Sequence, residues 1–337
     1  MDENNSKMDK IDFVLLWVDD NDPEWQESYK HYSKIEFGES QEVRFRDWGT
    51  LKYWFRGVEC FTPWVNRIFF VTCGHYPQWL NINHPKLKFV KHSDYIPKKY
   101  LPTFNSHTIE LNLHRIKELG DNFVYFNDDT FIINHIQPER FFKEGKLREI
   151  AVLNAPQPSG DTMDHILCND IAFANKFFNK KTIIRNNFTR WFCLKYRGNL
   201  LRTLALLKYP GFTGFIDPHL PNPFYKDTLT NVWNMYAEKL DQTCKCRFRN
   251  IGNVNQYIFR YYQLLKGDFK PINPFLTSIT YSAIDDNSLL NAISDLKTQK
   301  KPLICINDGV VSDFEKSKVL LLEAFDSILP DKSSFEL

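Results

Sequence analysis

The sequence has no uninterrupted apolar run close to the roughly 18–20 residues that a membrane-spanning helix requires. Its first ten residues are polar and lack the apolar core of a signal peptide. We therefore expect residues 1–10 to form a short disordered lead-in. Together these absences predict a cytoplasmic protein.

The usual signatures of cysteine-rich and phosphate-loop proteins are also missing. The seven cysteines are odd in number and scattered, which argues against a disulfide framework. Cys244 and Cys246 have no second pair at zinc-site spacing. No Gly-x-Gly-x-x-Gly or Gly-Lys-Ser/Thr loop is present, so neither a dinucleotide fingerprint nor a P-loop explains the function.

One segment lacks acidic residues altogether. Residues 171–216 contain no Asp or Glu, while nine Lys and Arg alternate there with leucines and aromatic residues. This pattern predicts a largely helical, basic and amphipathic insertion over about 171–210. It favours docking on an anionic membrane surface or holding a phosphorylated, lipid-linked acceptor. The alternative is an ordinary helix pair whose basic face is solvated.

Over the whole chain the charges nearly balance. The 43 Lys and Arg against 41 Asp and Glu give a net charge of +2, so no nucleic-acid partner is expected. Aromatic residues are frequent, at 15%, and could serve a sugar-binding surface or a plain core. A chain of 337 residues can bury a large core, and we expect one domain over 11–337.

Several apolar runs end in acidic or amide side chains. Residues 123–131 read as one buried strand that contains Asn127, Asp128 and Asp129. Residues 11–18 form a similar run before Asp19, Asp20 and Asp22, and residues 302–306 precede Asn307 and Asp308. Ligands of open α/β sheets bind at the carboxyl ends of strands. These acids are therefore expected to face one crevice.

Strand and helix patterns alternate along the chain. Further strands are predicted at 67–72, 87–90 and 149–153, and helices at 50–60 and from 313 to 327. The alternation predicts an α/β fold with an open, mostly parallel, Rossmann-like sheet and helices on both faces. The tail after Pro330 is expected to be a surface terminus.

Two further segments carry chemistry-bearing side chains. Residues 105–116 predict a helix that places His107, Glu110 and His114 on one polar face. His219 lies between Pro218 and Pro221, and a histidine held in a rigid loop near an acid is a reasonable general base. Arg249 precedes an aromatic helix and could present its guanidinium group to a phosphate.

Four stretches, in order, resemble the conserved regions of the Stealth family. They are Ile11–Asp19, the region from Arg44 to Phe131 with "RFRD", "YLPTFNSHTIELNLHRI" and "FVYFNDDTFI", the segments "DPHLPNPFYKDTL" and "RFRN" to "RYYQL", and "CINDG" to "SSFEL". The chain departs from the pattern at Asp20, where the family commonly has Gly. It also departs at residues 48–57, where Lys52 keeps a positive charge but cannot reproduce an arginine fork.

The resemblance implies a specific reaction on a nucleotide-sugar-transferase-like sheet. Stealth proteins include bacterial capsular and exopolysaccharide phosphotransferases and the catalytic subunit of the animal transferase that tags lysosomal enzymes. The implied activity transfers a sugar 1-phosphate from a nucleotide sugar to a sugar hydroxyl of a glycan or lipid-linked glycan, releasing a nucleoside monophosphate. A divalent metal is implied too, usually Mg²⁺, with Mn²⁺ as an alternative. The short chain favours a bacterial cell-surface polysaccharide enzyme.

The hypothesis assigns a role to each candidate residue. His219 takes the acceptor proton, Arg249 and Arg46 neutralise the transferred phosphoryl group, and Asp128 and Asp129, with Asp19 or Asp308, hold the metal. The catalytic set is His219, Arg249, Asp128, Asp129 and Asp308. The expected substrate-binding residues are Asp19, Asp22, Arg46, Lys52, Asn105, His107, Glu110, Arg115, Asn127 and Asn307. Alternatives are a metal-dependent glycosyltransferase that releases a nucleoside diphosphate, and a non-catalytic saccharide-binding protein.

Overall fold

The computed structural model describes residues 10–34, 46–157, 160, 162–282 and 284–337. The expected lead-in lies almost entirely outside these residues. The strands are β1 (Ile11–Leu16), β2 (Ile68–Thr72), β3 (Leu87–Lys91), β4 (Asn122–Phe126), β5 (Thr130–Ile132), β6 (Phe142–Lys143), β7 (Lys146–Glu149), β8 (Asn222–Tyr225), β9 (Phe269–Pro271), β10 (Ser278–Tyr281) and β11 (Leu303–Ile306).

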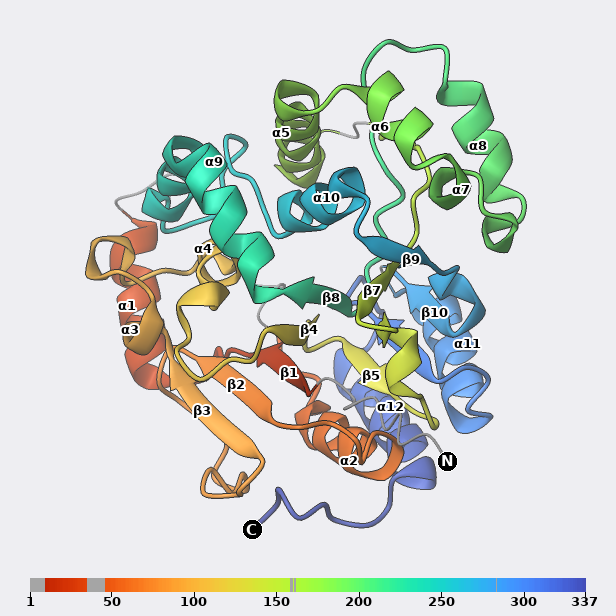
Figure 1. Ribbon diagram of the computed structural model, residues 1–337. Helices are drawn as coiled ribbons and strands as arrows, with labels where there is room; N and C mark the ends of the chain where they lie inside the picture. The colour runs from red at the N-terminus through yellow and green to blue at the C-terminus, as the bar shows by residue number, and fades with distance from the viewer. Residues whose placement is uncertain (1–9, 35–45, 158–159, 161, 283) are drawn as a thin grey trace, which may run out of the picture.

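The α-helices connect and cover these strands (Figure 1). They are α1 (Pro23–Ser33), α2 (Leu51–Phe61), α3 (His92–Tyr95), α4 (Ser106–Leu111), α5 (Thr162–Phe177), α6 (Lys180–Asn186), α7 (Phe188–Trp191), α8 (Asn199–Leu206), α9 (Lys226–Lys245), α10 (Tyr257–Lys266), α11 (Asp286–Lys297) and α12 (Phe314–Ile328). No helix in the described ranges is long and apolar enough to cross a bilayer.

The central sheet has five strands in the order β3-β2-β1-β4-β8. The first four are parallel, and β8 runs antiparallel to β4 at one edge. The register sets Leu15 of β1 beside Phe126 of β4, so the segments after these two strands leave the sheet side by side. The predicted mostly parallel α/β sheet is confirmed.

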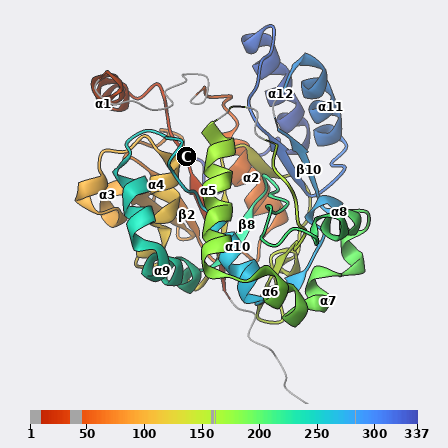
Figure 2. The same cartoon turned by 90° about the horizontal axis from the view of Figure 1, so that it is seen from above.

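Alternate residues of the strands enter two separate cores. Phe13, Phe70 and Val124 pack with α2 on one face, whereas Val14 and Phe69 pack with α4, α9 and α10 on the other. This alternation is the period-2 pattern of a strand buried on both faces. Figure 1 shows α9 and α10 above the sheet and α2 below it. Figure 2 shows α11 and α12 side by side at the upper right.

A second sheet, β10-β11-β5, adjoins the first. Strand β11 is parallel to β10 and antiparallel to β5. Helix α2 approaches β5 closely at Gly57, where an added Cβ atom would lie 2.2 Å from the carbonyl oxygen of Ile132. Any side chain at Gly57 would therefore push β5 away. Strands β6, β7 and β9 form a third sheet.

Three predicted elements differ from the structure. The single strand predicted over 123–131 is two strands, β4 and β5, which enter different sheets on either side of residues 127–129. The helix predicted over 105–116 stops at Leu111 and is followed by a 3₁₀ turn. The strand predicted over 149–153 ends at Glu149, after which Leu153 makes only an isolated bridge to Phe215.

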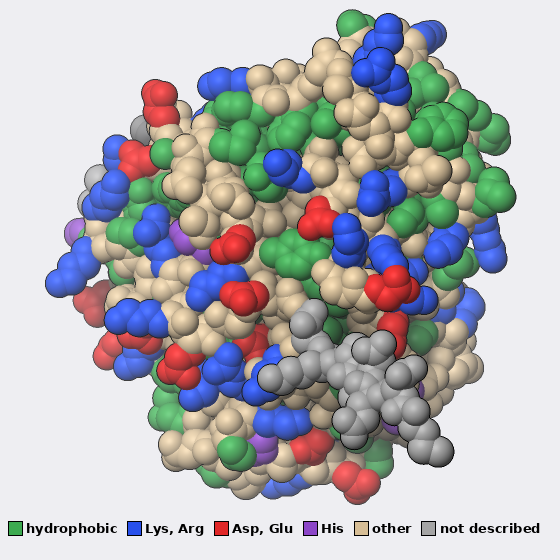
Figure 3. Space-filling model, in the orientation of Figure 1, with side chains coloured by type: hydrophobic (Ala, Val, Ile, Leu, Met, Phe, Trp, Pro, Cys, Tyr) green, Lys and Arg blue, Asp and Glu red, His purple; other side chains and the backbone are tan. Residues whose placement is uncertain are grey.

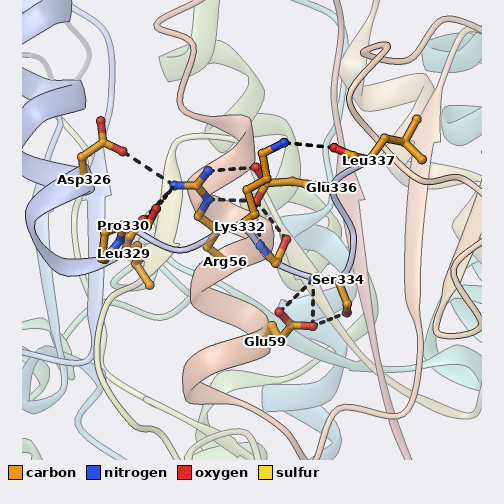
Figure 4. Close-up of polar contacts among 10 residues, drawn as sticks. Arg56, Glu59, Asp326, Leu329, Pro330, Lys332, Ser334, Glu336 and Leu337 are labelled. Carbon is orange, nitrogen blue, oxygen red and sulfur yellow. Dashed lines mark hydrogen bonds and ion pairs between the residues drawn. The ribbon is translucent and has the colours of Figure 1, made fainter.

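The prediction of a surface tail after Pro330 is wrong. Phe335 is buried in the core, and the buried carboxylate of Glu336 pairs with Arg56 of α2 at 2.8 Å through both of its oxygens. Arg56 also donates to the carbonyl oxygen of Leu329 (Figure 4). The tail is therefore a packed element that closes over α2. Periodicity could not reveal this, because one aromatic and one acidic side chain carry the contact.

Candidate active site

The segments that follow β1, β4 and β11 and the segment that precedes β8 meet at one edge of the sheets. Because β8 is antiparallel to β4, its amino end lies at the carboxyl end of β4, which places the loop containing His219 beside Asp129. The antiparallel pairing of β11 with β5 brings Cys305 opposite Thr130. Residues from four distant parts of the sequence are thereby brought together.

The central contact is an acid–imidazole pair. The Nε2 atom of His219 lies 2.8 Å from the Oδ2 atom of Asp129. Burial would raise the pKa of Asp129, but the charge and hydrogen bond of His219 outweigh that effect and lower it. Burial would likewise lower the pKa of His219, but Asp129 outweighs it and raises that pKa. Each side chain thus favours the charged form of the other.

A chain of polar contacts leads from His219 into the core. The Nδ2 atom of Asn127 lies 3.4 Å from Nε2 of His219, and its Oδ1 atom lies 2.6 Å from the hydroxyl of Tyr125. The same hydroxyl lies 3.2 Å from Oε1 of Glu110. A tyrosine hydroxyl has one proton to donate, so both contacts are satisfied when Glu110 is protonated. Burial raises the pKa of Glu110 to about 7, which fits this arrangement.

Arg249 joins the network from the other side. Its Nη2 atom donates to the hydroxyl of Ser106 at 2.9 Å, at the start of α4, and its charge partly offsets the rise in the pKa of Glu110. Asn105, which was expected to bind substrate, caps α4 and donates to the carbonyl oxygens of Cys246 and Phe248. Asn105 therefore holds the segment that presents Arg249.

A cavity of about 120 Å³ opens beside Asp129. Arg46 and Asp308 lie on its wall and form a two-pronged ion pair with distances of 2.5 and 3.0 Å. The Arg46 guanidinium also packs 4.1 Å from the ring centre of Phe314. The cavity is lined by Trp17, Val18, Arg46, Asp47, Trp48, Thr50, Leu51, Asp128, Asp129, Phe131, Ile306, Asn307, Asp308 and Leu321.

Asp128 lies at the mouth of this cavity. The residue is exposed, yet loss of hydration beside the neighbouring protein atoms, followed by the charge of Asp129, raises the pKa of its carboxyl group. Solvent at the cavity mouth moderates that rise. Asp47 raises the pKa further. Crowded carboxylates of this kind are stabilised by a cation.

Two sets of side chains could hold a metal ion. Asp129, His219 and Cys305 offer ligand atoms that all lie within 4.8 Å of one another, a mixed set that suits a borderline metal such as zinc. The oxygens of Asp128, Asp129, Asp308 and Asn307 share the cavity and suit a hard cation such as Mg²⁺. The Cys305 thiol donates to Asp129. The oxygen set, which does not include Cys305, matches the preference of Mg²⁺ for oxygen ligands.

The His219 loop is held by a fully buried arginine. Arg260 of α10 pairs with Glu149 at 2.8 Å and with Asp217 at 2.6 Å, and the hydroxyl of Tyr261 donates to Asp217 at 2.6 Å. Asp217 precedes His219 by two residues. The position of the imidazole therefore depends on this buried ion-pair network.

The other predicted site residues lie in different surroundings. Asp22 caps α1 through the backbone N–H of Trp25, and the backbone N–H of Asp19 donates to Nε2 of His75 at 2.8 Å. Lys52 lies in the first turn of α2, next to the cavity residue Leu51. The substrate-binding roles of these three residues stay predictions.

His107 and Arg115 lie in different parts of the segment predicted as one helix, in α4 and in the 3₁₀ turn that follows it. His107 is buried in α4. Arg115 is exposed, bonds to Asn112 and stacks on Trp233 of α9. The early end of α4 breaks the predicted polar face of His107, Glu110 and His114, because His114 falls in the 3₁₀ turn. The proposed roles of His107 and Arg115 also stay predictions.

Sequence reasoning did not assign five residues of the site: Ser106, Tyr125, Cys305, Asp217 and Arg260. The sequence marks Tyr125 and Cys305 only as strand residues, because nothing in a strand pattern shows which side chain bonds an acid. Asp217 is marked only as the acid near His219. The one available signal for Arg260 is an arginine among the aromatic residues of its helix.

Comparisons with known proteins identify the family of the chain. The family models "Stealth protein CR1, conserved region 1" and "Stealth protein CR2, conserved region 2" match residues 9–36 and 44–150. The chain is 40% identical over 334 residues to the capsular polysaccharide phosphotransferase WcwK of Streptococcus pneumoniae, covering 98% of both chains.

Two further relatives are similarly complete. The exopolysaccharide phosphotransferase cps2G of Lactiplantibacillus plantarum is 39% identical, with 97% of this chain and 96% of the relative covered. The receptor polysaccharide phosphotransferase WefC of Streptococcus gordonii is 38% identical, with 98% and 100% covered. Full-length similarity at this level, together with the two matched regions, shows that the chain belongs to the Stealth family.

Proposed function

We propose that the protein transfers a sugar 1-phosphate from a nucleotide sugar to a hydroxyl of a growing cell-surface polysaccharide. The reaction forms a phosphodiester and releases a nucleoside monophosphate. The observation that carries the proposal is the pairing of His219 with Asp129 beside a cavity lined by carboxylates and Arg46. The phosphotransferase names of the full-length relatives support it. A cytoplasmic location stays a prediction.

His219 acts as the general base in this proposal. Because Asp129 is ionised, the ring nitrogen that faces it carries the proton, and the Nδ1 atom is left with the lone pair. Nδ1 takes the proton of the acceptor hydroxyl as its oxygen bonds to phosphorus. The bond between that phosphorus and the nucleoside monophosphate oxygen breaks, and its electron pair leaves with the monophosphate.

Cationic side chains would balance the charge that develops on the phosphate oxygens. Arg249, held by Ser106 on one side of the site, and Arg46, on the cavity wall, are proposed to contact the donor phosphates. Arg46 is paired with Asp308, so contact with a phosphate would require it to share or exchange that partner. Lys52 is proposed to add a positive charge near the nucleotide.

A divalent cation, Mg²⁺ or Mn²⁺, completes the proposal. Asp128, Asp129 and Asp308 would hold it, with Asn307 as a further oxygen ligand. When bound, such an ion neutralises the pyrophosphate and stabilises the leaving monophosphate. It would also remove the repulsion between the neighbouring carboxylates of Asp128 and Asp129.

The products of turnover test the proposal. The protein is incubated with UDP-, GDP- and CMP-sugars, an acceptor glycan and Mg²⁺, and released nucleotides are separated by chromatography. We expect nucleoside monophosphate to appear in step with a phosphodiester-linked product, and we expect His219→Ala to lower turnover by about 10²–10⁴-fold. Nucleoside diphosphate release would instead identify a glycosyltransferase. Glycan binding without consumption of any nucleotide sugar would identify a binding protein.

A further inference from the structure

Large apolar side chains are exposed over residues 188–209. Leu194 is 86% exposed and Leu201 is 71% exposed, values unusual for leucine in a folded domain. We call this region the α7–α8 surface. Its exposed large apolar residues are Phe188, Leu194, Leu201, Leu204, Leu207 and Tyr209.

Helix α8 carries leucines on both of its sides. Leu200 and Leu206 are partly buried against the core beside the buried Thr203, whereas Leu201 and Leu204 are exposed. The hydroxyl of Thr203 accepts a hydrogen bond from the backbone N–H of Leu153 at 3.1 Å. The side of a surface helix that faces solvent normally carries polar residues. In α8 that side carries two leucines as well.

Buried polar contacts fix α8 in this orientation. The ammonium group of Lys180, itself buried, donates to the backbone carbonyl oxygens of Leu206 and Tyr209 at 2.7 and 2.8 Å, at the carboxyl end of the helix. A cation at this end also interacts favourably with the helix dipole. The exposure of Leu201 and Leu204 is therefore fixed by the buried contacts of α8.

The charges on the α7–α8 surface have one sign. Lys195, Arg197, Arg202 and Lys208 are exposed there, and residues 171–216 contain no Asp or Glu. Figure 3 shows hydrophobic and basic side chains over the upper right of the molecule, where Figure 1 places α7 and α8. Basic residues that border exposed leucines are typical of surfaces that lie on anionic lipid.

We propose that the α7–α8 surface docks the protein on an anionic lipid bilayer, with the leucines entering the headgroup region and the basic residues contacting lipid phosphates. A second copy of the chain is a poorer partner, because a symmetric contact would place two sets of basic residues against each other without acids. Docking does not depend on the proposed transfer reaction.

The α7–α8 surface is connected directly to the loop of His219. Thr203 binds the backbone of Leu153, and Leu153 forms a β-bridge with Phe215, four residues before His219. A short, hydrogen-bonded path therefore runs from the proposed lipid contact to the proposed base. This arrangement suits an acceptor carried by the membrane.

Sedimentation with lipid vesicles tests the proposal. The full chain is mixed with vesicles of phosphatidylcholine alone or with about 30% phosphatidylglycerol, at low salt and at roughly 1 M salt. We expect binding only to the anionic vesicles at low salt. Leu201→Ser with Leu204→Ser should weaken that binding by at least about tenfold, and so should Arg202→Glu with Lys208→Glu.

Matched changes outside the α7–α8 surface serve as controls. Leu290 and Lys297 are exposed on α11, so Leu290→Ser with Lys297→Glu should leave vesicle binding and the unfolding temperature unchanged. Equal binding of the unmodified protein to neutral and anionic vesicles would overturn the proposal, and so would its failure to bind either kind. Undiminished binding by the Leu201/Leu204 variant would also overturn it. A dimer in sedimentation velocity that the same variant dissociates would also overturn it and assign the surface to self-association.

Discussion

The Nε2 atom of His219 and the Oδ2 atom of Asp129 lie 2.8 Å apart, although 90 residues separate them in the sequence. The antiparallel strand β8 makes this contact possible, because its amino end meets the carboxyl end of β4. The pair fixes which imidazole nitrogen holds a proton. It therefore links the fold directly to the proposed proton transfer.

The pH dependence of turnover should follow this pair. The pKa of His219 is raised above 6.5, so a base that must be neutral works only as the pH rises through that higher value. Asp129→Asn removes the carboxylate that raises the pKa, and the rising limb of kcat/KM should move to lower pH. The check is a pH–rate profile of both proteins, with the exposed Asp331→Asn as control. An unmoved limb would contradict the assignment.

Glu110→Gln should stabilise the protein at neutral and higher pH. The folded-state pKa of Glu110 is about 7, against 4.5 for the free side chain, so ionisation costs stability as the pH rises between these values. Glutamine keeps the size of the protonated acid and carries no charge, so it avoids the cost of burying a carboxylate. Its advantage should be absent near pH 4 and reach up to roughly 3 kcal/mol above pH 7. Denaturant unfolding at several pH values measures it, and a pH-independent difference would contradict the prediction.

The two possible metal-ligand sets predict different mutant behaviour. Asp128→Asn should raise the Mg²⁺ concentration that gives half-maximal turnover by roughly tenfold or more, because an oxygen ligand loses its charge. Cys305→Ser should leave that concentration nearly unchanged, since the serine hydroxyl can also donate to Asp129. Titration of chelator-treated protein with Mg²⁺ measures both. Equal shifts in the two variants would place Cys305 among the ligands.

Arg260→Lys should lower kcat through the loop of His219. Lysine keeps the charge but cannot bind Glu149 and Asp217 together through a planar fork. We expect a loss of stability of roughly 2–4 kcal/mol and a fall in kcat of about tenfold, with little change in the KM for the donor.

Arg140→Lys is the matched control for Arg260→Lys. Arg140 is also buried, and it donates to the hydroxyl of Thr277. Its replacement should reduce stability but leave kcat unchanged well below the unfolding temperature. A similar loss of kcat in both variants would show that Arg260 acts only on stability.

Glu336→Ala should destabilise the protein even though it lies one residue from the end. It removes the nearer of the two carboxylates that pair with the buried guanidinium of Arg56, the other being that of Asp326 at 3.6 Å, at a cost of roughly 2–4 kcal/mol. Burial would raise the pKa of Glu336, but the hydrogen bonds from Arg56 and Ser333 outweigh it and lower that pKa. The stabilisation is therefore present above pH 4.5 and lost as the pH falls through the lower folded value. Thermal unfolding checks both points, and the exposed Asp331→Ala should change neither.

Patterns in the sequence predicted the sheet because buried strands leave a strong local signal. Apolar runs located β1, β2, β3, β4 and β11, and the strand–helix alternation predicted that the sheet is mostly parallel. The bends that depend on tertiary contacts were missed. The chain turns at Asn127 to enter a second sheet, and α4 ends at Leu111, because packing partners elsewhere in the chain decide both features.

The candidate site was predicted in part for the same reason. His219 and Asp129 could be named because each lies next to a recognisable pattern, and a shared sheet edge predicted that they converge on one crevice. Their direct contact was not predicted, because it depends on the antiparallel strand β8. The pairing of Arg46 with Asp308 and the support of Asp217 by Arg260 could not be predicted. Residues far apart in sequence form these ion pairs, and no periodicity connects them.

Gly57 shows how a residue with no functional group can set the dimensions of the site. Helix α2 touches strand β5 where any larger residue would collide with the carbonyl oxygen of Ile132. Strand β5 begins one residue after Asp129, so displacing it would carry the acid away from His219. Even one methyl group at position 57, on the other side of the strand from His219, would thus widen the separation of the catalytic pair. The absence of a side chain at this position is therefore a structural requirement of the site.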